Sequence, residues 1–318
     1  MDNSIKVFGE YTFYEDNKEI YRSKNLLTKF GKRYITQYLA GQSNTNLKDI
    51  ALGVGSIAAT VNDTQLGFEF YRSPVSMSSI DIQTNSSTGV STYGVVYKTT
   101  VPVDVAGIIS EVGLFPAVSL NSTDYASNSI STFEDNQSWA DSTGAYPTSV
   151  TNPFPKIGTS YLSIGAAASQ SKEYFNSFNI DVSGYSALDS LTLAYYQSDT
   201  NLDYVFVRMY DSSNSYYEIR YSGDLSTGYK VKSLTLNNLY SSGFGSGTPD
   251  QSSIVKISCG VKAKSSGATA ALFDGMRIND EDSFRTDYGL ISRSVLTSPI
   301  TKSLGKQMVI EYRIGLTF

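Results

Sequence analysis

The sequence contains no histidine, and this absence removes more chemistry than any other feature of its composition. Without imidazole there is no Ser-His-Asp or Cys-His nucleophile, no histidine proton shuttle and no ordinary zinc site. An enzyme built on this chain would have to work through carboxylates alone. The densest acidic run, INDEDSF at 278–284, is typical of a solvated turn. It does not indicate two carboxylates held about 5–9 Å apart for hydrolysis, so we expect a protein that is not an enzyme.

Cysteine, charge and long apolar runs are also scarce. Cys259 is the only cysteine, which excludes an internal disulfide, and the alternating run SSIVKISCGVKA around it predicts a small core side chain. Charged residues make up only 17% of the chain and the net charge is −5, which argues against nucleic acid as a partner. No segment approaches the ~20 apolar residues of a membrane span, and the N-terminus lacks the apolar stretch of a secretory signal. We therefore expect synthesis in a cytoplasm and no membrane insertion.

Ser, Thr, Asn, Gly and 24 Tyr are abundant instead, which favours β-structure with many turns. At 318 residues the chain is long enough for two domains. The alternating segment at 4–23 predicts two strands joined by a turn near Asp16. At 25–42 apolar residues recur every three or four positions, which predicts one helix, capped by Thr28 and ended by Gly41.

From about Asn121 to Glu281 the composition shifts towards Ser, Asn, Asp and Tyr. Short strands recur there at regular spacing, and this pattern predicts a two-sheet β-sandwich of the jelly-roll type. The predicted strands are 160–166, 174–182, 190–197, 204–211, 216–222, 230–237, 253–263 and 270–278.

One predicted hairpin is split. The segment IISEVGLFP at 108–116 has the pattern of a strand that needs an antiparallel partner, but the chain after it is polar and rich in turn residues. The segment YGLISRSVL at 288–296 supplies that partner, so a whole domain interrupts the hairpin. The predicted fold is therefore mainly β, with a discontinuous β-rich base domain at 1–120 plus 284–318. This base domain carries the one helix, and a jelly roll at 121–283 is inserted into it.

In their order, the base segments resemble a module of bacteriophage tail and baseplate-associated virion proteins, over roughly residues 24–116 and 286–318. A capped helix precedes the Gly-x-Gly strand end IALGVGS, and an acidic residue and an arginine follow it. A strand with the pattern Glu-x-Gly-Leu-Phe comes next. A strand that contains an arginine then leads into a terminal strand that contains a lysine. The matching positions are Glu69, Arg72, Glu111, Gly113, Leu114, Phe115, Arg293 and Lys302. The shorter members of that family lack the insert. The resemblance implies a non-enzymatic structural protein of the virion, in the tail, baseplate or fibre, that contacts other virion proteins and forms a homo-oligomer.

The insert has a resemblance of its own, carried by STFEDNQSWAD, GTSYLSIGAA and ALFDGMRIND. These segments are similar to jelly-roll carbohydrate-binding modules, many of which hold a structural calcium ion through a glutamate and a terminal aspartate. The matching positions here are Glu134 and Asp274, and carboxylate oxygens are ligands that Ca²⁺ prefers. The alternative is that both are solvated acids at strand ends. We expect Trp139 to be a core residue.

One strand of the insert has an unusual outer face. In DYVFVRMYDS, Val205, Val207 and Met209 form an ordinary core face, whereas the other face carries three rings and an arginine. Aromatic rings beside arginine and carboxylate suit a host surface polysaccharide. The alternative is that this face packs on the base domain or on another virion subunit. The candidate glycan-binding residues, including those from neighbouring strands, are Tyr196, Tyr204, Phe206, Arg208, Tyr210, Tyr216, Glu218 and Arg220.

Two alternative functions remain at the level of the whole protein. One is a capsid decoration or head-fibre protein, and the other is an accessory carbohydrate-binding module of a glycan-active enzyme.

Overall fold

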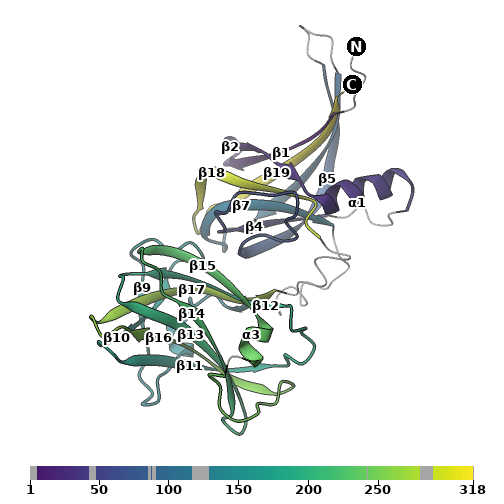
Figure 1. The fold of residues 1–318 in the computed structure, drawn as a ribbon. Coiled ribbons are helices and arrows are strands. Elements are labelled where there is room, and N and C mark those ends of the chain that lie inside the picture. The colour runs from purple at the N-terminus through teal and green to yellow at the C-terminus, as the bar shows by residue number, and fades with distance from the viewer. Residues whose placement is uncertain are drawn as a thin grey trace. The chain divides into compact units, whose positions relative to one another are not determined.

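The computed structural model describes residues 6–42, 48–84, 87, 91–116, 129–241, 243–279 and 289–317. The fold is mainly β, as the sequence predicts. The chain forms two compact units (Figure 1). The base unit comprises Met1–Asn121 and Ser283–Phe318, and the insert unit comprises Ser122–Asp282. No helix in these described ranges is long and apolar enough to cross a membrane.

The base unit is built on one antiparallel nine-stranded sheet with the strand order β2-β1-β19-β6-β5-β4-β7-β18-β3. Asp16 and Asn17 join β1 to β2 with φ angles of 51° and 62°, as a tight two-residue hairpin turn requires, which confirms the predicted first hairpin. The strands are β1 (Lys6–Glu15), β2 (Lys18–Lys24), β3 (Leu26–Leu27), β4 (Lys48–Gly53), β5 (Glu69–Thr84), β6 (Ser91–Val101), β7 (Gly107–Pro116), β18 (Ser292–Lys302) and β19 (Met308–Thr317).

The split hairpin closes as predicted. Strands β7 and β18 pair antiparallel, with Leu114 opposite Ser292 and Gly113 opposite Arg293. Strand β4 pairs with the other edge of β7, so β7 is central in the sheet and almost every residue along it is buried. The two strands that flank the insert in the sequence are thus neighbours in the base sheet.

The predicted helix is also confirmed, as α1 (Lys29–Leu39). The Thr28 hydroxyl accepts a hydrogen bond from the Gly31 N–H at 2.9 Å, and Gly41 has a φ of 70°, so both predicted caps are present. Gly31 would weaken an isolated helix, but a Cβ at this position would overlap the carbonyl group of Ile291. The glycine allows α1 to lie directly against the chain that leads into β18.

The insert unit is a sandwich of two antiparallel sheets, as predicted. One sheet has six strands in the order β15-β12-β17-β10-β9, with β8 also paired to β17, and the other has the order β11-β16-β13-β14. Apolar side chains of both sheets form a single core, which includes Trp139 and Cys259, so both of these predicted core residues are confirmed. The strands are β8 (Ser129–Ser131), β9 (Thr148–Val150), β10 (Tyr161–Ala166), β11 (Ser171–Ile180), β12 (Ser190–Gln197), β13 (Leu202–Asp211), β14 (Tyr216–Ser222), β15 (Gly228–Thr235), β16 (Ile254–Ala263) and β17 (Thr269–Asn279).

The described part of the insert unit also contains two short helical turns, η1 (Asn136–Ser138) and α3 (Leu236–Tyr240). The sequence pattern predicts a strand that continues to Asn237, but the chain turns into α3 after Thr235. Leu236 and Leu239 are both buried, and their three-residue spacing places both side chains on one face of a helical turn.

Candidate functional sites

The outer face of the four-stranded sheet gathers most of the predicted glycan-binding residues. On β13, alternation puts Val205, Val207 and Met209 in the core and the rings and arginine on the opposite side. Strand β14 pairs with β13 so that Arg208 is opposite Glu218 and Tyr210 is opposite Tyr216, which places these four side chains on the same face. We call this surface the ring-and-arginine face. Its members are Glu173, Phe175, Tyr204, Phe206, Arg208, Tyr210, Tyr216, Glu218, Arg220, Phe244 and Lys256.

The charged groups at the centre of this face are all paired. Arg208 donates to Glu218 at 2.6 Å and to Glu173 at 2.8 Å, and Arg220 donates to the other oxygen of Glu218. Glu218 is only 1% exposed. Burial, followed by the charge of Glu173, raises the pKa of Tyr210, which keeps its hydroxyl protonated. The centre of the face is therefore a closed ion-pair network that holds three strands in register.

The aromatic rings of the face pack against the two guanidinium groups. Arg208 lies 4.8 Å from the centroid of Tyr216, and Arg220 lies 4.6 Å from that of Tyr204 and 3.6 Å from that of Phe244. These distances are within the range of cation–π attraction. Sequence reasoning missed Phe244. The only signal for it is an isolated aromatic residue in the Gly- and Ser-rich segment SSGFGSG.

Two of the three rings on the outer face of β13 are almost completely buried. Phe206 is 2% exposed and Tyr210 is 6% exposed. Phe206 is covered because Gly260 on β16 leaves room for its ring, and a Cβ at position 260 would overlap that ring. Tyr204 and Tyr216 remain half-buried, and Phe244 is 45% exposed. The rings of this face that stay partly exposed are thus Tyr204, Tyr216 and Phe244, with Phe175 on β11 at the opposite edge.

Tyr196 does not belong to this face. It lies on β12 in the six-stranded sheet, opposite Tyr229 on β15 and Leu272 on β17. The prediction that its strand neighbours β13 is therefore wrong. The sequence shows that Tyr196 is on a strand, but the pattern of a strand does not tell which of two sheets that strand joins.

The two predicted calcium ligands bind one loop. Glu134 accepts hydrogen bonds from the N–H groups of Thr159 and Ser160, and the Oδ2 atom of Asp274 accepts from the N–H groups at 156 and 157. Between these contacts lies Gly158, with a φ of 65°. A Cβ there would overlap the carboxylate of Glu134, so glycine is required for this close approach. The structure thus places both predicted residues against residues 156–160.

Asp274 keeps one oxygen unused. Its Oδ2 atom also accepts a hydrogen bond from the Tyr229 hydroxyl at 2.6 Å, but its Oδ1 atom is buried and has no hydrogen-bond partner among the described residues. Burial, more than any other effect, raises the pKa of Asp274 to about 7, and the charge of Glu134 adds to the increase. A buried acceptor with no donor suits a cation. Both oxygens of Glu134 already accept hydrogen bonds, however, and the described residues contain no cluster of three or more Asp, Glu, Cys or His. Any calcium ion here would need backbone carbonyl groups as further ligands.

In the base unit, the residues that match the virion-protein pattern form an internal network. The carboxylate of Glu111 accepts hydrogen bonds from the N–H groups of Gly55, Gly67 and Phe68 at 2.8–3.0 Å. It also pairs with Arg293 at 2.7 Å. We call this arrangement the Glu111 clasp. A Cβ at Gly55 would overlap the Glu111 carboxylate, so the Gly-Val-Gly segment makes room for an internal carboxylate.

The other matched polar residues of the base unit also have structural contacts. Arg72 pairs with Glu69 at 2.8 Å and lies 3.8 Å from the ring centroid of Phe115. The Lys302 ammonium group is buried and donates to the carbonyl oxygens of Val105 and Ser303. These residues support the fold of the base unit. The acidic run INDEDSF falls outside the described residues from position 280 onwards.

Comparisons with known proteins give neither a matching family model nor a matching curated protein. Solved structures with partial similarity include the agarase AgWH50C, at 13% identity and a TM-score of 0.36, over 48% of this chain and 26% of the agarase. A family 11 carbohydrate-binding module from Clostridium thermocellum, solved with a mixed-linked tetrasaccharide, has 13% identity and a TM-score of 0.34 over 48% of this chain and 94% of the module. The tailspike protein 4 domain of bacteriophage CBA120 has 14% identity and a TM-score of 0.30 over 52% of this chain and 22% of that domain. Similarities this weak assign no function.

Proposed function

We propose that this protein is a non-enzymatic structural component of a phage particle, in its tail, baseplate or fibre, and that its insert unit binds a polysaccharide of the host surface. The ring-and-arginine face is the main support. Its half-buried Tyr204 and Tyr216 and its more exposed Phe244 offer ring surfaces beside the partly exposed guanidinium group of Arg220. Rings pack against the apolar faces of sugars, and N–H donors bind hydroxyl groups.

The same face supports a binding role over a catalytic one. Glycoside hydrolysis requires one carboxyl group that donates a proton and a second that acts as base or nucleophile. The two carboxylates of the face, Glu173 and Glu218, are both held by Arg208, and Glu218 is held by Arg220 as well. This arrangement stiffens the face but directs neither carboxylate towards a ligand.

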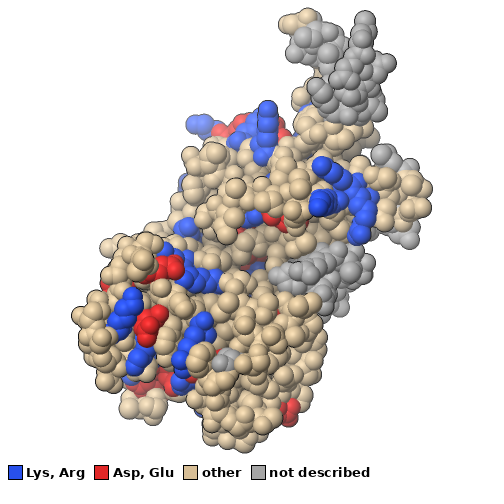
Figure 2. Space-filling model, viewed as in Figure 1, with Lys and Arg blue, Asp and Glu red and all other residues tan. Residues whose placement is uncertain are grey.

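The charge distribution also favours a sugar over a nucleic acid. Basic and acidic side chains are interspersed on the insert surface in Figure 2 and do not form one basic stripe. On the ring-and-arginine face, each arginine contacts a glutamate. Phosphate binding favours an excess of unpaired basic groups.

The base unit is the part that we assign to attachment. Its matched residues lie in the order found in the virion proteins that it resembles, and those described here stabilise its own sheet, as the Glu111 clasp does. We propose that the base unit contacts other virion proteins and is present in several copies. Multiple copies would strengthen a weak interaction between each insert and the polysaccharide through avidity.

We also propose a structural calcium ion in the insert unit. Asp274 and Glu134, together with backbone carbonyl groups, would hold it, and the Oδ1 atom of Asp274, which lacks a partner among the described residues, supports this assignment. The ion would offset the buried charge of Asp274.

Two experiments test the proposed function. Images of virions labelled with an antibody against this chain should show it at the tail or baseplate, whereas label on the capsid would favour a decoration or head-fibre protein. A glycan array probed with the full chain should identify a bound polysaccharide. Binding should weaken at least tenfold, or about 1.4 kcal/mol, in Tyr204→Ala/Tyr216→Ala.

The matched control is Tyr146→Ala, which removes a 61% exposed tyrosine of the insert unit outside the ring-and-arginine face and should leave binding unchanged. Equal binding by the double variant and the wild type, with both folded, would remove the assigned face from the proposal.

A further inference from the structure

The core face of the base sheet continues beyond the core along four strands. Tyr11, Tyr312 and Tyr97 stand opposite one another on β1, β19 and β6, with the first two fully buried. Two further rows follow on the same face, because residues in register on neighbouring strands share a face. We call these two rows the apolar ladder, which consists of Val7, Ile80, Ile82, Tyr93, Val95, Ile314 and Leu316.

The ladder becomes more exposed with distance from the core. Ile80 is 72% exposed and Ile82 61%, while Tyr93 and Val7 are 46% and 41% exposed. Single exposed apolar residues are normal, but contiguous apolar surfaces usually mark an interface. These side chains are contiguous, since Ile82 is opposite Tyr93 and Tyr93 is opposite Leu316.

The reverse face of the same strands carries charged side chains. Arg313 pairs there with Asp81 at 2.7 Å, and Glu10 pairs with Arg22 at 3.0 Å. The described ladder itself contains no charged side chain. The projecting part of the sheet is thus amphipathic, with charge confined to one face.

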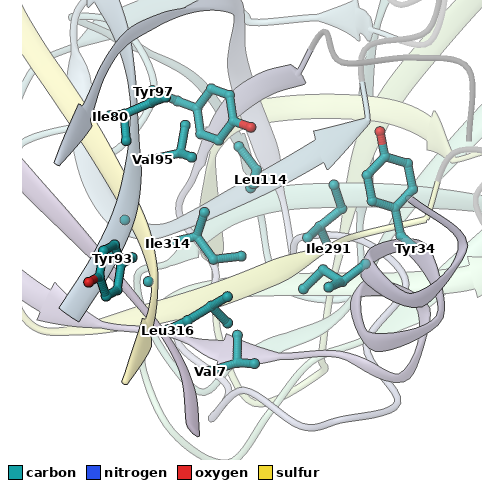
Figure 3. Close-up of a pocket in the computed structure, with 13 residues that line it drawn as sticks. Val7, Tyr34, Ile80, Tyr93, Val95, Tyr97, Leu114, Ile291, Ile314 and Leu316 are labelled. Atoms are coloured by element: carbon teal, nitrogen blue, oxygen red, sulfur yellow. The ribbon is translucent and has the colours of Figure 1, made fainter. Parts of the chain in front are cut away.

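A pocket of about 300 Å³ opens beside the ladder. Figure 3 shows Ile314, Leu316 and Val7 on one side of it and Tyr34 of α1 on the other, with Ile291 between them. The lining is almost entirely apolar side chains. A buried apolar cavity of roughly half this volume can hold benzene, so the pocket has room for more than one aliphatic side chain.

We propose that the apolar ladder and its pocket form the contact between two copies of this chain. Exposed isoleucines and an apolar pocket lie on the same surface of one unit, so two copies related by a twofold axis can each insert side chains into the pocket of the other. The face carries no charge, and therefore the contact buries no unpaired ion, whereas a charged partner would leave its own charge buried there. The proposed function requires several copies of this chain, and the apolar ladder is the surface through which two of them would touch. It does not depend on what the insert unit binds.

Sedimentation velocity of the full chain over a range of concentrations tests the contact. The wild type should associate, and Ile82→Lys should weaken association at least tenfold. The matched control is Gln83→Lys, which adds the same charge at the next residue on the reverse face, where Gln83 contacts Asp81. It should leave association within about twofold of the wild type, or about 0.4 kcal/mol.

A milder substitution provides a second measurement. Cys259 is the only cysteine and is buried, so a thiol-specific cross-linker should react with an introduced thiol alone. Ile82→Cys should give a covalent dimer with a short bis-maleimide. Gln83→Cys should still associate, but its thiol lies on the opposite face and should give no covalent dimer. A wild type that is monomeric throughout, association that survives Ile82→Lys, or no Ile82→Cys dimer would each overturn the inference. Glycan binding by a monomeric wild type would overturn this contact but leave the proposed glycan binding intact. Dimerisation without glycan binding would support the contact and count against the proposed glycan binding.

Discussion

The base unit and the insert unit each bury a carboxylate, but the hydrogen-bond donors and ion-pair partners around the two carboxylates differ. In the base unit, Glu111 receives three backbone N–H donors and the guanidinium group of Arg293. In the insert unit, Asp274 receives three donors on one oxygen, none on the other, and has no ion-pair partner within the described residues. Both groups are fully buried. Glu111 therefore has its hydrogen bonds and its charge satisfied within the fold, whereas Asp274 has an oxygen that a further ligand could bind.

This difference sets how each unit should respond to its surroundings. Glu111 joins β7 to β18, two strands between which the whole insert lies in sequence, so its bonds are part of the base fold. Asp274 carries a raised pKa of about 7 because burial opposes its charge. The insert should therefore respond to pH and to cations at this residue. Trp139, the only tryptophan, lies in the insert core and reports on that unit alone.

The largest expected effect is the loss of the Glu111 clasp. Glu111→Ala leaves Arg293 buried without this partner and removes the acceptor for three N–H groups, which should lower the free energy of unfolding by about 3–5 kcal/mol. Urea denaturation followed by far-ultraviolet circular dichroism should show an early transition, while the Trp139 fluorescence transition should stay in place.

The control for this change is Glu10→Ala. It breaks the ion pair with Arg22, whose side chain is 50% exposed, and should cost no more than about 1 kcal/mol. If Glu111→Ala were as mild as Glu10→Ala, the clasp would not hold the base unit together.

The next effect concerns pH. The pKa of Asp274 rises from 3.8 to about 7 on folding, so between these values the folded state binds more protons than the unfolded state. Stability must then fall as pH rises through this window, by a few kcal/mol in total. Urea titrations followed by Trp139 fluorescence at pH 5 and pH 8, with chelator present, should show this fall, and Asp274→Asn should remove it. The same slope in Asp274→Asn would assign the effect to another group.

Calcium should act in the opposite direction at the same residue. An ion that binds only the folded insert stabilises it by mass action, by about 2.7 kcal/mol at a hundredfold excess over the dissociation constant. The melting temperature from Trp139 fluorescence should therefore rise with Ca²⁺ and fall with chelator, and Asp274→Asn should show neither change. Identical melting with Ca²⁺ and with chelator, at pH 8, would rule out the ion.

Much of the fold could be predicted because local patterns determine it. The cap at Thr28, the turn at Asp16 and Asn17, and the alternation along β13 need only neighbouring residues. The split hairpin could also be predicted, since the sequence directly after Pro116 is polar and rich in turn residues, whereas 288–296 has the pattern of a partner strand.

The candidate sites were harder to predict because they depend on residues far apart in the chain. Phe206 is buried because Gly260 leaves space for its ring, and the alternation along one strand does not show this space. The prediction groups Tyr196 with the wrong sheet, because its strand pattern does not show which strands lie beside it. The spare oxygen of Asp274 depends on how residues 156–160 fold around its carboxylate.

The measurement that tests the central claim most directly is calorimetric titration of the full chain with the polysaccharide found on the array, followed by measurement of the polysaccharide's chain length. We predict binding that Tyr204→Ala/Tyr216→Ala weakens at least tenfold, with the polysaccharide recovered at its original length. A shortened polysaccharide would show an enzyme, and equal affinity in the folded double variant would show that the ring-and-arginine face is not the binding site.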